Sequence, residues 1–192
     1  GSAASAVQII PEVAKTAAQL TVFQRTPNWV VPRRDVPVSP QEQALMFTEP
    51  ETAMDIGARS RQLMYDNADH FFWQVFQWTQ AGREAYTAIA TNHLNDQVRD
   101  PELRKKLTPD YPVGCRRILI SDDYFPALQR DNVELVTSGP EKIDETGITA
   151  PDGTHREFDI LVFATGFETT EWKWSVNVKG VDGGHLNDVW AD

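Results

Sequence analysis

Six small residues at the start of the chain have the spacing of a phosphate-binding turn. In the pattern G-x-G-x-x-G, the first glycine permits a tight turn, the second lets the backbone approach a pyrophosphate, and the third allows close helix–strand packing. Alanine, the smallest substitute, takes the second and third glycine positions here: Gly1, Ser2, Ala3, Ala4, Ser5 and Ala6. The helix that follows would offer free amide groups to phosphates, so the first five residues are cofactor-binding candidates. The competing interpretation is that Gly1 and Ser2 remain from an expression tag.

A basic residue at the end of the next predicted strand bears on which dinucleotide would bind. Residues 20–24 form a short run with β-branched and aromatic residues at its centre, which indicates a buried strand. NAD sites place a carboxylate about 20 residues after the glycines, whereas NADP sites carry an arginine for the 2′-phosphate. Here Gln24, Arg25 and Thr26 end the strand without a carboxylate. A guanidinium can bind a phosphate through two hydrogen bonds, so this pattern favours NADP over the alternative, a solvated charge at a strand end.

The net charge of the chain limits the partners it can bind. The 192 residues include 18 Lys and Arg against 28 Asp and Glu, which gives a formal net charge of −10 at pH 7. A surface this acidic is unfavourable for nucleic acid and for anionic membranes. Any anionic ligand must therefore be held by a local basic cluster.

The cysteines, histidines and apolar runs exclude several other classes of protein. The single cysteine, Cys115, rules out an intrachain disulfide, so we expect a reducing compartment, the cytoplasm. No apolar run reaches membrane-span length, and we expect no signal peptide. We expect no metal site, because none of the histidines has a second ligand at metal spacing: His70, His93, His155 and His185.

Helix and strand patterns alternate in the first part of the chain, and helical patterns dominate the middle. Apolar spacing predicts a helix over residues 7–20, in which Pro11 should cause a kink or remove one hydrogen bond. Residues 27–40 are proline-rich and irregular. The middle should hold capping boxes at Ser39–Glu42 and Thr48–Glu51, helices over 51–80 and 83–98 with a break at Gly82, and a short helix from Asp100 to Leu107. Within it, the aromatic stretch 71–78 is typical of a buried helix. It would pack against a neighbouring domain or, alternatively, some of its aromatic residues would line a substrate tunnel.

Strand patterns return after residue 114. The sequence predicts strands at 117–120, 133–136, 142–143, 147–149 and 160–163, a helix at 123–130, and turns at Asp152–Gly153 and Gly183–Gly184. The strand at 160–163 is apolar throughout, which is typical of a strand buried on both faces. The predicted fold class is therefore α/β: a Rossmann-like dinucleotide-binding fold with a helical insertion and a small β-rich segment.

Four stretches of the chain resemble Baeyer–Villiger monooxygenases, which are class B flavoprotein monooxygenases. Their order and spacing also agree with that family. They are residues 21–29 (TVFQRTPNW), 111–117 (YPVGCRR), 123–128 (DYFPAL) and 163–167 (FATGF).

The resemblance implies a domain organisation. Enzymes of this family carry FAD in one dinucleotide fold and bind NADPH in a second, inserted one. The chain would then supply the first half of the NADP-binding domain (1–38), a helical insertion (39–110), the second half of that domain (111–166) and a return segment into the FAD domain (167–192). We expect the chain to be a piece of a longer protein, with the FAD-binding glycine turn and the first strand of its own sheet upstream. Alone it should be inactive and prone to self-association.

The resemblance also assigns roles to individual residues. Arg25 and Thr26 align with the pair that holds the 2′-phosphate, and Arg116 aligns with a basic residue, usually lysine, that contacts the same phosphate. Arg117 aligns with the catalytic arginine beside the flavin. Cofactor contacts are also expected from Gln24 and from the A-T-G-F stretch: Ala164, Thr165 and Gly166.

The implied reaction is the insertion of one oxygen atom from molecular oxygen next to a ketone carbonyl, giving an ester or lactone. A flavin peroxide would attack the ketone, and Arg117 would stabilise the anionic peroxide without being able to protonate it. Two alternatives stay open: an N- or S-oxygenating flavin-containing monooxygenase, and a nucleotide-binding module without chemistry.

Overall fold

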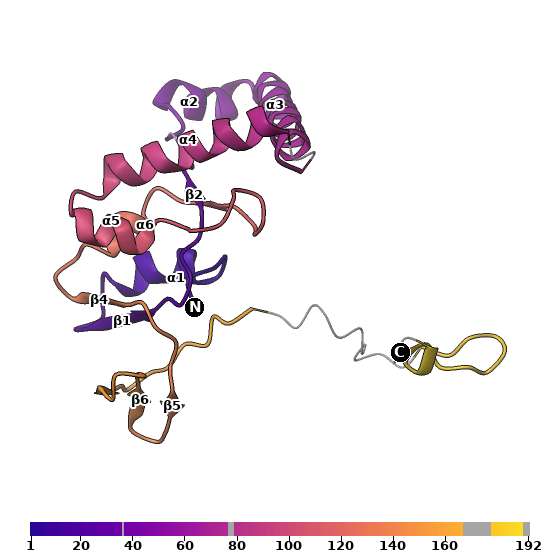
Figure 1. Ribbon diagram of the computed structural model, residues 1–192. Helices are drawn as coiled ribbons and strands as arrows, with labels where there is room; N and C mark the ends of the chain where they lie inside the picture. The colour runs from indigo at the N-terminus through magenta and orange to yellow at the C-terminus, as the bar shows by residue number, and fades with distance from the viewer. Residues whose placement is uncertain (36, 77–78, 167–177, 190–192) are drawn as a thin grey trace.

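The computed structural model describes residues 1–35, 37–76, 79–166 and 178–189 of the chain. The described helices are α1 (Ala6–Val13), α2 (Pro40–Thr48), α3 (Pro50–Phe76), α4 (Gln80–Gln97), α5 (Pro101–Leu107), α6 (Tyr124–Ala127) and α7 (Leu186–Val189). The described strands are β1 (Leu20–Phe23), β2 (Val30–Val31), β3 (Leu119–Ile120), β4 (Val133–Val136), β5 (Lys142–Ile143), β6 (Gly147–Thr149) and β7 (His155–Glu157). Figure 1 shows α2, α3 and α4 at one end of the molecule, the parallel strands in the middle and the β5–β7 sheet at the other end.

The strands confirm a mixed α/β fold but do not form one continuous sheet. Strand β1 pairs with β4 in parallel, with Leu20 opposite Val133. Strand β2 pairs with β3 in parallel, with Val30 opposite Leu119. Among the described residues these pairs are separate, and the segment that joins β1 to β2 contains Pro27, which has no N–H to donate to a ladder. The predicted irregular segment 27–40 thus contains a strand, β2, that sequence reasoning missed.

Helix α1 packs its apolar face into the main core, as the spacing predicted. Val7, Ile10 and Ala14 are buried there with Tyr124 and Phe125 of α6. The helix ends at Val13 rather than near residue 20.

The side chain of Asn132, from a distant part of the chain, binds at this early end of α1. Asn132 Nδ2 donates to the Ala14 and Ala17 carbonyl oxygens at 3.1 and 2.8 Å. These bonds satisfy carbonyls at the helix terminus that have no partner within the helix.

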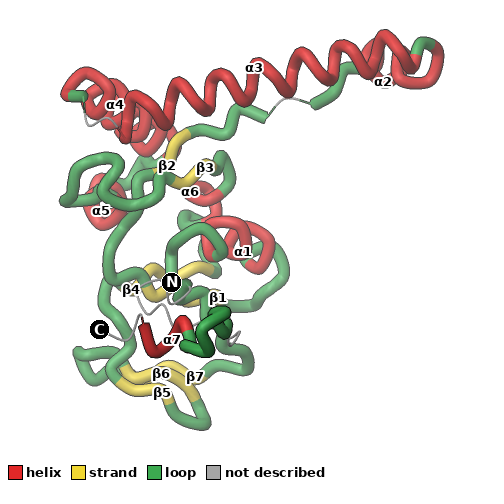
Figure 2. Tube along the Cα trace, turned by 90° about the vertical axis from the view of Figure 1, so that its right-hand side faces the viewer, coloured by secondary structure: helices red, strands yellow, loops and turns green. Residues whose placement is uncertain are grey.

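The helical middle of the chain confirms some of the predicted boundaries. Helix α2 begins with a complete capping box: Ser39 Oγ accepts from the Glu42 N–H at 3.2 Å, and the Glu42 carboxylate accepts from the Ser39 N–H at 2.8 Å. Asp100 caps α5 by accepting from the Glu102 N–H at 2.9 Å. Figure 2 shows α3 as a long rod extending away from the parallel strands.

Two predicted boundaries in the same region are wrong. Thr48 is the last residue of α2, and its hydroxyl donates to the Ala44 carbonyl oxygen instead of capping α3. Gly82 does not break a helix: it is buried inside α4, whose N-cap is Thr79. The Thr79 hydroxyl accepts from the Gly82 N–H at 3.2 Å, so the cap begins the helix three residues before the glycine.

The aromatic stretch 71–78 can be followed only in part. Residues 71–76 belong to α3, and Trp73 is exposed. The other side chains of the stretch lie outside the described residues.

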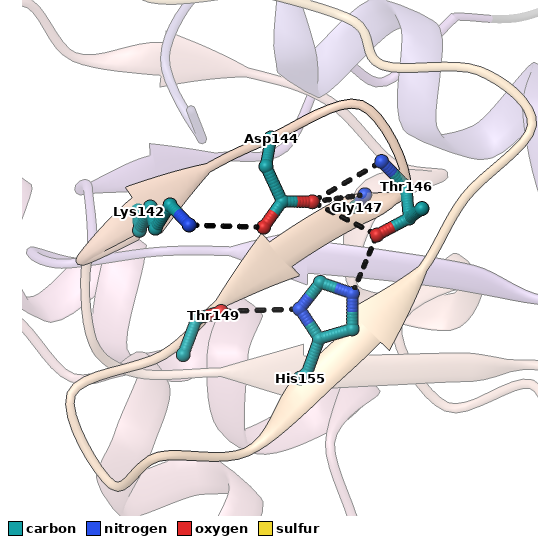
Figure 3. A network of polar contacts seen from close by, with 6 residues as sticks. All are labelled: Lys142, Asp144, Thr146, Gly147, Thr149 and His155. Carbon is teal, nitrogen blue, oxygen red and sulfur yellow. Dashed lines mark hydrogen bonds and ion pairs between the residues drawn. The ribbon is translucent and has the colours of Figure 1, made fainter.

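Strands β5, β6 and β7 form an antiparallel sheet held by a polar network (Figure 3). The Asp144 carboxylate accepts from the N–H and the hydroxyl of Thr146 at 3.1 and 2.9 Å, and these bonds lower the pKa of Asp144 to about 2. The His155 ring lies between the hydroxyls of Thr146 and Thr149, each 3.0 Å from a ring nitrogen. The network closes both hairpins, and Gly153, at φ +81°, lies in the predicted turn.

An ion pair ties this small sheet to the parallel strands. Arg156 of β7 donates from Nε and Nη2 to the two carboxylate oxygens of Glu134 on β4, at 2.9 and 2.7 Å. The rings of Phe23 and Phe158 also meet edge to face, with centroids 6.4 Å apart. The β5–β7 sheet is therefore held against the β1–β4 pair.

The strand predicted at residues 160–163 is absent from this structure, and the prediction of burial is wrong. Ile160, Val162 and Phe163 are 78, 58 and 68% exposed. A strand of this kind needs neighbours on both edges and both faces, and no described segment pairs with these residues. None of the helices within the described ranges is long and apolar enough to cross a bilayer.

Candidate functional site

A cavity of about 740 Å³ opens where β1 ends. Figure 1 places α5 between α4 and the β1–β4 pair, and α5 forms one wall of the cavity. The lining residues come from the end of β1, from α5, from the loop before β3 and from the end of β4: Gln24, Arg25, Thr26, Pro27, Glu102, Lys105, Lys106, Thr108, Asp110, Tyr111, Cys115, Arg116 and Thr137. The cavity thus joins the predicted residues Gln24, Arg25, Thr26 and Arg116.

Arg25 and Thr26 lie at the carboxyl end of a parallel strand. The last ladder bond of β1 runs from the Gln24 N–H to the Val136 carbonyl oxygen at 2.8 Å. The chain then leaves the sheet, so the next two residues stand at the edge where ligands bind to open parallel sheets.

The predicted glycine turn is attached to this strand end. Ser2 Oγ donates to the Thr26 carbonyl oxygen at 3.4 Å. Asn28 Nδ2 donates to the carbonyl oxygen and to Oγ of Ser2 at 2.9 and 3.2 Å. Ser2 therefore lies beside Thr26, although it does not line the cavity.

Arg116 is held against an aromatic ring that also lines the cavity. Its guanidinium carbon lies 5.0 Å from the centroid of Tyr111, a favourable cation–π distance. Tyr111 is fixed in turn by its hydroxyl, which donates to the Pro27 carbonyl oxygen at 3.0 Å, and by Trp29 Nε1, which donates to the Tyr111 carbonyl oxygen at 2.8 Å. Burial raises the pKa of the Tyr111 hydroxyl, so the ring stays neutral beneath the guanidinium.

The cavity concentrates positive charge in an acidic protein. Four cations line it, Arg25, Lys105, Lys106 and Arg116, against two carboxylates, Glu102 and Asp110. None of these cations forms an ion pair with a carboxylate of the described residues, whereas cations elsewhere do, among them Lys15, Arg33, Lys142 and Arg156. An unpaired basic cluster in a chain of net charge −10 fits an anionic ligand.

Sequence reasoning missed the two lysines. They stand in the last turn of α5, after Arg104, and the run of three basic residues was the available signal. Basic residues at a helix C-terminus are also common for electrostatic reasons alone, so the run did not distinguish a ligand site from a favourable helix end.

Gln24 is fully buried, and its side chain is used within the protein. Its Oε1 accepts from the Tyr124 hydroxyl at 3.1 Å, and its Nε2 donates to the Lys106 carbonyl oxygen at 3.4 Å. Only 2% of Gln24 is exposed. The side chain thus connects β1, α6 and α5 at the wall of the cavity.

The remaining predicted site residues lie outside this cavity. Arg117 is exposed and forms no hydrogen bond or ion pair with the described residues.

Gly1 lies against the backbone of Ala164, so closely that a side chain at Gly1 would meet the Ala164 carbonyl oxygen. The turn at the start of the chain therefore meets the A-T-G-F stretch, where Thr165 and Gly166 are exposed and Gly166 has a φ of +94°. The other members of the turn that do not line the cavity are Ala3, Ala4 and Ser5.

Tyr124, which supports Gln24, should make stability depend on alkaline pH. Burial raises the pKa of its hydroxyl well above the usual value, which is about 10 in an unfolded chain. The folded state then keeps a proton that the unfolded state loses, so stability is intact below about pH 10 and falls above it. We expect Tyr124→Phe to lower the free energy of unfolding by about 1–3 kcal/mol at pH 8, because the hydrogen bond is lost and the Gln24 oxygen stays buried without this donor. The variant should also lose less stability than the wild type as the pH rises above about 10.

Urea unfolding at pH 8 and at pH 10.5 checks this expectation. Tyr65→Phe is the matched control, because Tyr65 is exposed. An alkaline slope in Tyr124→Phe equal to that of the wild type would contradict it.

Among the described residues, no group of three or more His, Cys, Asp or Glu side chains could hold a metal ion. His93, for example, is buried with Nε2 2.8 Å from the Ser121 carbonyl oxygen.

Comparison with known proteins gives clear relatives, although no protein-family model matches the chain. The chain is 40% identical over 192 residues to a Baeyer–Villiger monooxygenase of Streptomyces coelicolor, covering 99% of the chain and 36% of that protein. It is 35% identical to a Baeyer–Villiger monooxygenase of Pseudomonas aeruginosa, covering 100% of the chain and 35% of that protein. It is also 35% identical to the FAD-binding monooxygenase ktnD of Aspergillus niger, covering 100% of the chain and 31% of that protein. These matches confirm the resemblance, and the chain spans about a third of the length of these relatives.

Solved structures agree with the sequence relatives. The open crystal structure of cyclohexanone monooxygenase matches with a TM-score of 0.73 and 27% identity, covering 100% of this chain and 44% of that one. A structure of OTEMO in complex with FAD and NADP matches with a TM-score of 0.72 and 25% identity, covering 100% and 42%.

Proposed function

Because the chain is similar over its whole length to Baeyer–Villiger monooxygenases, we propose that it is the NADP-binding part of an FAD- and NADPH-dependent monooxygenase. The enzyme inserts one oxygen atom from molecular oxygen next to a ketone carbonyl, giving an ester or lactone. Within this proposal, residues 1–38 and 111–166 form the NADP-binding domain, 39–110 is a helical insertion, and 167–192 leads into the FAD domain. Within this chain, the observation that carries the assignment of NADP binding is the basic cavity at the end of β1.

The residues of this cavity fit the 2′-phosphate of NADP(H). Arg25 and Arg116 are exposed and have no carboxylate partner among the described residues, so both are free to pair with an anion. Thr26 adds a hydroxyl. A charge-assisted contact of this kind is about twice as strong as a neutral hydrogen bond. No carboxylate takes the place of Arg25 to bind the ribose hydroxyl of NAD.

The close contact between Gly1 and Ala164 fits the part of the proposal in which the pyrophosphate and the flavin bind near these two residues. The backbone at Gly1 has no room for a side chain, and Thr165 and Gly166 are exposed beside it. FAD, when bound, supplies the transfer of electrons from NADPH to molecular oxygen.

Arg117 is the residue of this chain that would serve oxygen transfer. It follows Arg116 directly, and its guanidinium is exposed and unpaired among the described residues. It stabilises the negative charge that an oxygen atom carries as it is transferred to the carbonyl. Because a guanidinium does not lose its proton near neutral pH, it stabilises this charge without protonating it.

Calorimetric titration of the full chain with NADP⁺ and NAD⁺ tests the nucleotide assignment. We expect NADP⁺ to bind at least ten-fold more tightly, because only NADP⁺ carries the 2′-phosphate. Equal affinities would overturn the assignment. Product analysis of the FAD-loaded enzyme with a ketone and with an organic sulfide tests the reaction: ester formation supports it, and oxidation of the sulfide alone favours the N- or S-oxygenating alternative.

A further inference from the structure

We infer that helix α5 is a specificity element of the phosphate site: Lys105 and Lys106 add the positive charge that makes the cavity select a dinucleotide bearing a 2′-phosphate. The inference rests on the proposed function and extends it to residues that neither the predicted motifs nor the resemblance assigned.

The orientation of α5 is fixed by the residues on its other faces. Leu107 is buried in the main core and Leu103 packs against that core. Arg104 donates from Nε and Nη2 to the Val98 carbonyl oxygen at 3.1 and 2.8 Å, which ties α5 to the residue that ends α4. The face that remains, at spacing i, i+3 and i+4, carries Glu102, Lys105 and Lys106 and lines the cavity.

A buried hydrogen bond also ties this helix to the strand that carries Arg25. Gln24 Nε2 donates to the Lys106 carbonyl oxygen at 3.4 Å, while Gln24 Oε1 accepts from the Tyr124 hydroxyl at 3.1 Å. Gln24 directly precedes Arg25 in the chain. The arginine side of the cavity and the lysine side are therefore joined through one buried side chain, and a ligand that contacts both meets a preorganised site.

The charges around the cavity show why the lysines matter for selectivity. With them, the lining carries four cations and two carboxylates. Without them, Arg25 and Arg116 would face Glu102 and Asp110, and the formal charge of the lining would fall from plus two to zero. Both lysines are exposed and unpaired among the described residues, so no competing carboxylate has to be displaced when a phosphate binds.

The test is a calorimetric titration of the full chain with NADP⁺, NAD⁺ and 2′,5′-ADP. We expect the double variant Lys105→Ala/Lys106→Ala to bind NADP⁺ and 2′,5′-ADP about ten-fold more weakly than the wild type and NAD⁺ within about two-fold, since a charge-assisted contact is lost only where a 2′-phosphate is present. The variant Lys105→Arg/Lys106→Arg should keep the NADP⁺ preference, because it keeps both charges. The matched control Lys15→Ala/Lys142→Ala removes the same net charge from lysines that pair with Glu12 and Asp144, and it should leave the preference unchanged.

The outcomes separate this inference from the proposed function. If the wild type does not prefer NADP⁺ over NAD⁺, the proposed function fails and the inference fails with it. If the wild type prefers NADP⁺ and the double alanine variant keeps the full preference, or the control loses as much, only the inference is wrong. If the alanine variant fails to fold, as judged by circular dichroism, Lys105→Gln/Lys106→Gln takes its place with the same expected result.

Discussion

Arg117→Ala should lower the rate of oxygen insertion in the FAD-loaded enzyme by about 100- to 1,000-fold, the usual cost of removing one donor that stabilises a developing oxyanion. NADP⁺ affinity should change by less than about two-fold, because Arg117 does not line the basic cavity. Consumption of NADPH should persist without formation of ester, since the role proposed for Arg117 comes after electrons have left the nicotinamide.

The measurement for Arg117 compares ester formed with NADPH consumed. Arg117→Lys should recover part of the rate because it restores the charge but not the planar geometry. Arg130→Ala is the matched control, an exposed arginine away from both predicted sites. Product formation near the wild-type level in Arg117→Ala would remove this residue from the mechanism.

Arg25→Ala should weaken NADP⁺ binding by about 10- to 150-fold, which corresponds to the roughly 1.5–3 kcal/mol of a hydrogen bond to a charged group. The affinity for NAD⁺ should hardly change, because NAD⁺ has no 2′-phosphate to lose. The dinucleotide preference of the chain would therefore largely disappear in this single variant.

Titration of Arg25→Ala with both dinucleotides checks this prediction, with Arg33→Ala as the control. Arg33 stands eight residues later, and its Nε lies 2.8 Å from a carboxylate oxygen of Asp35, outside the cavity. Equal losses of NADP⁺ and NAD⁺ affinity in Arg25→Ala would mean that the arginine supports the fold of the strand end rather than the 2′-phosphate.

Local sequence signals were sufficient wherever neighbouring residues alone decide the structure. The capping box of Ser39 and Glu42 and the Asp100 cap of α5 form between residues two or three positions apart, so the sequence predicts both helix starts. Gly82 was misread for the opposite reason. Helix α4 tolerates a buried glycine in its first turn because Thr79 caps the helix. A glycine alone therefore does not show whether a helix is interrupted at that position.

Features that depend on distant parts of the chain were beyond the sequence patterns. The apolar run 160–163 predicts a buried strand only if neighbours cover it, and in this structure Ile160 and Phe163 are exposed. Lys105 and Lys106 became candidates only when the packing of α5 and the bond from Gln24 showed which face of the helix lines the cavity.

The proposed function requires above all that the basic cavity at the end of β1 holds the 2′-phosphate of NADP(H). The most direct measurement is phosphorus NMR of NADP⁺ during titration with the wild-type chain and with Arg25→Ala/Arg116→Ala. We expect the resonance of the 2′-phosphate to shift on binding to the wild type and to stay at its free position at the same concentration of the double variant. A shift of the pyrophosphate resonances alone, with the 2′-phosphate unmoved in the wild type, would contradict the claim.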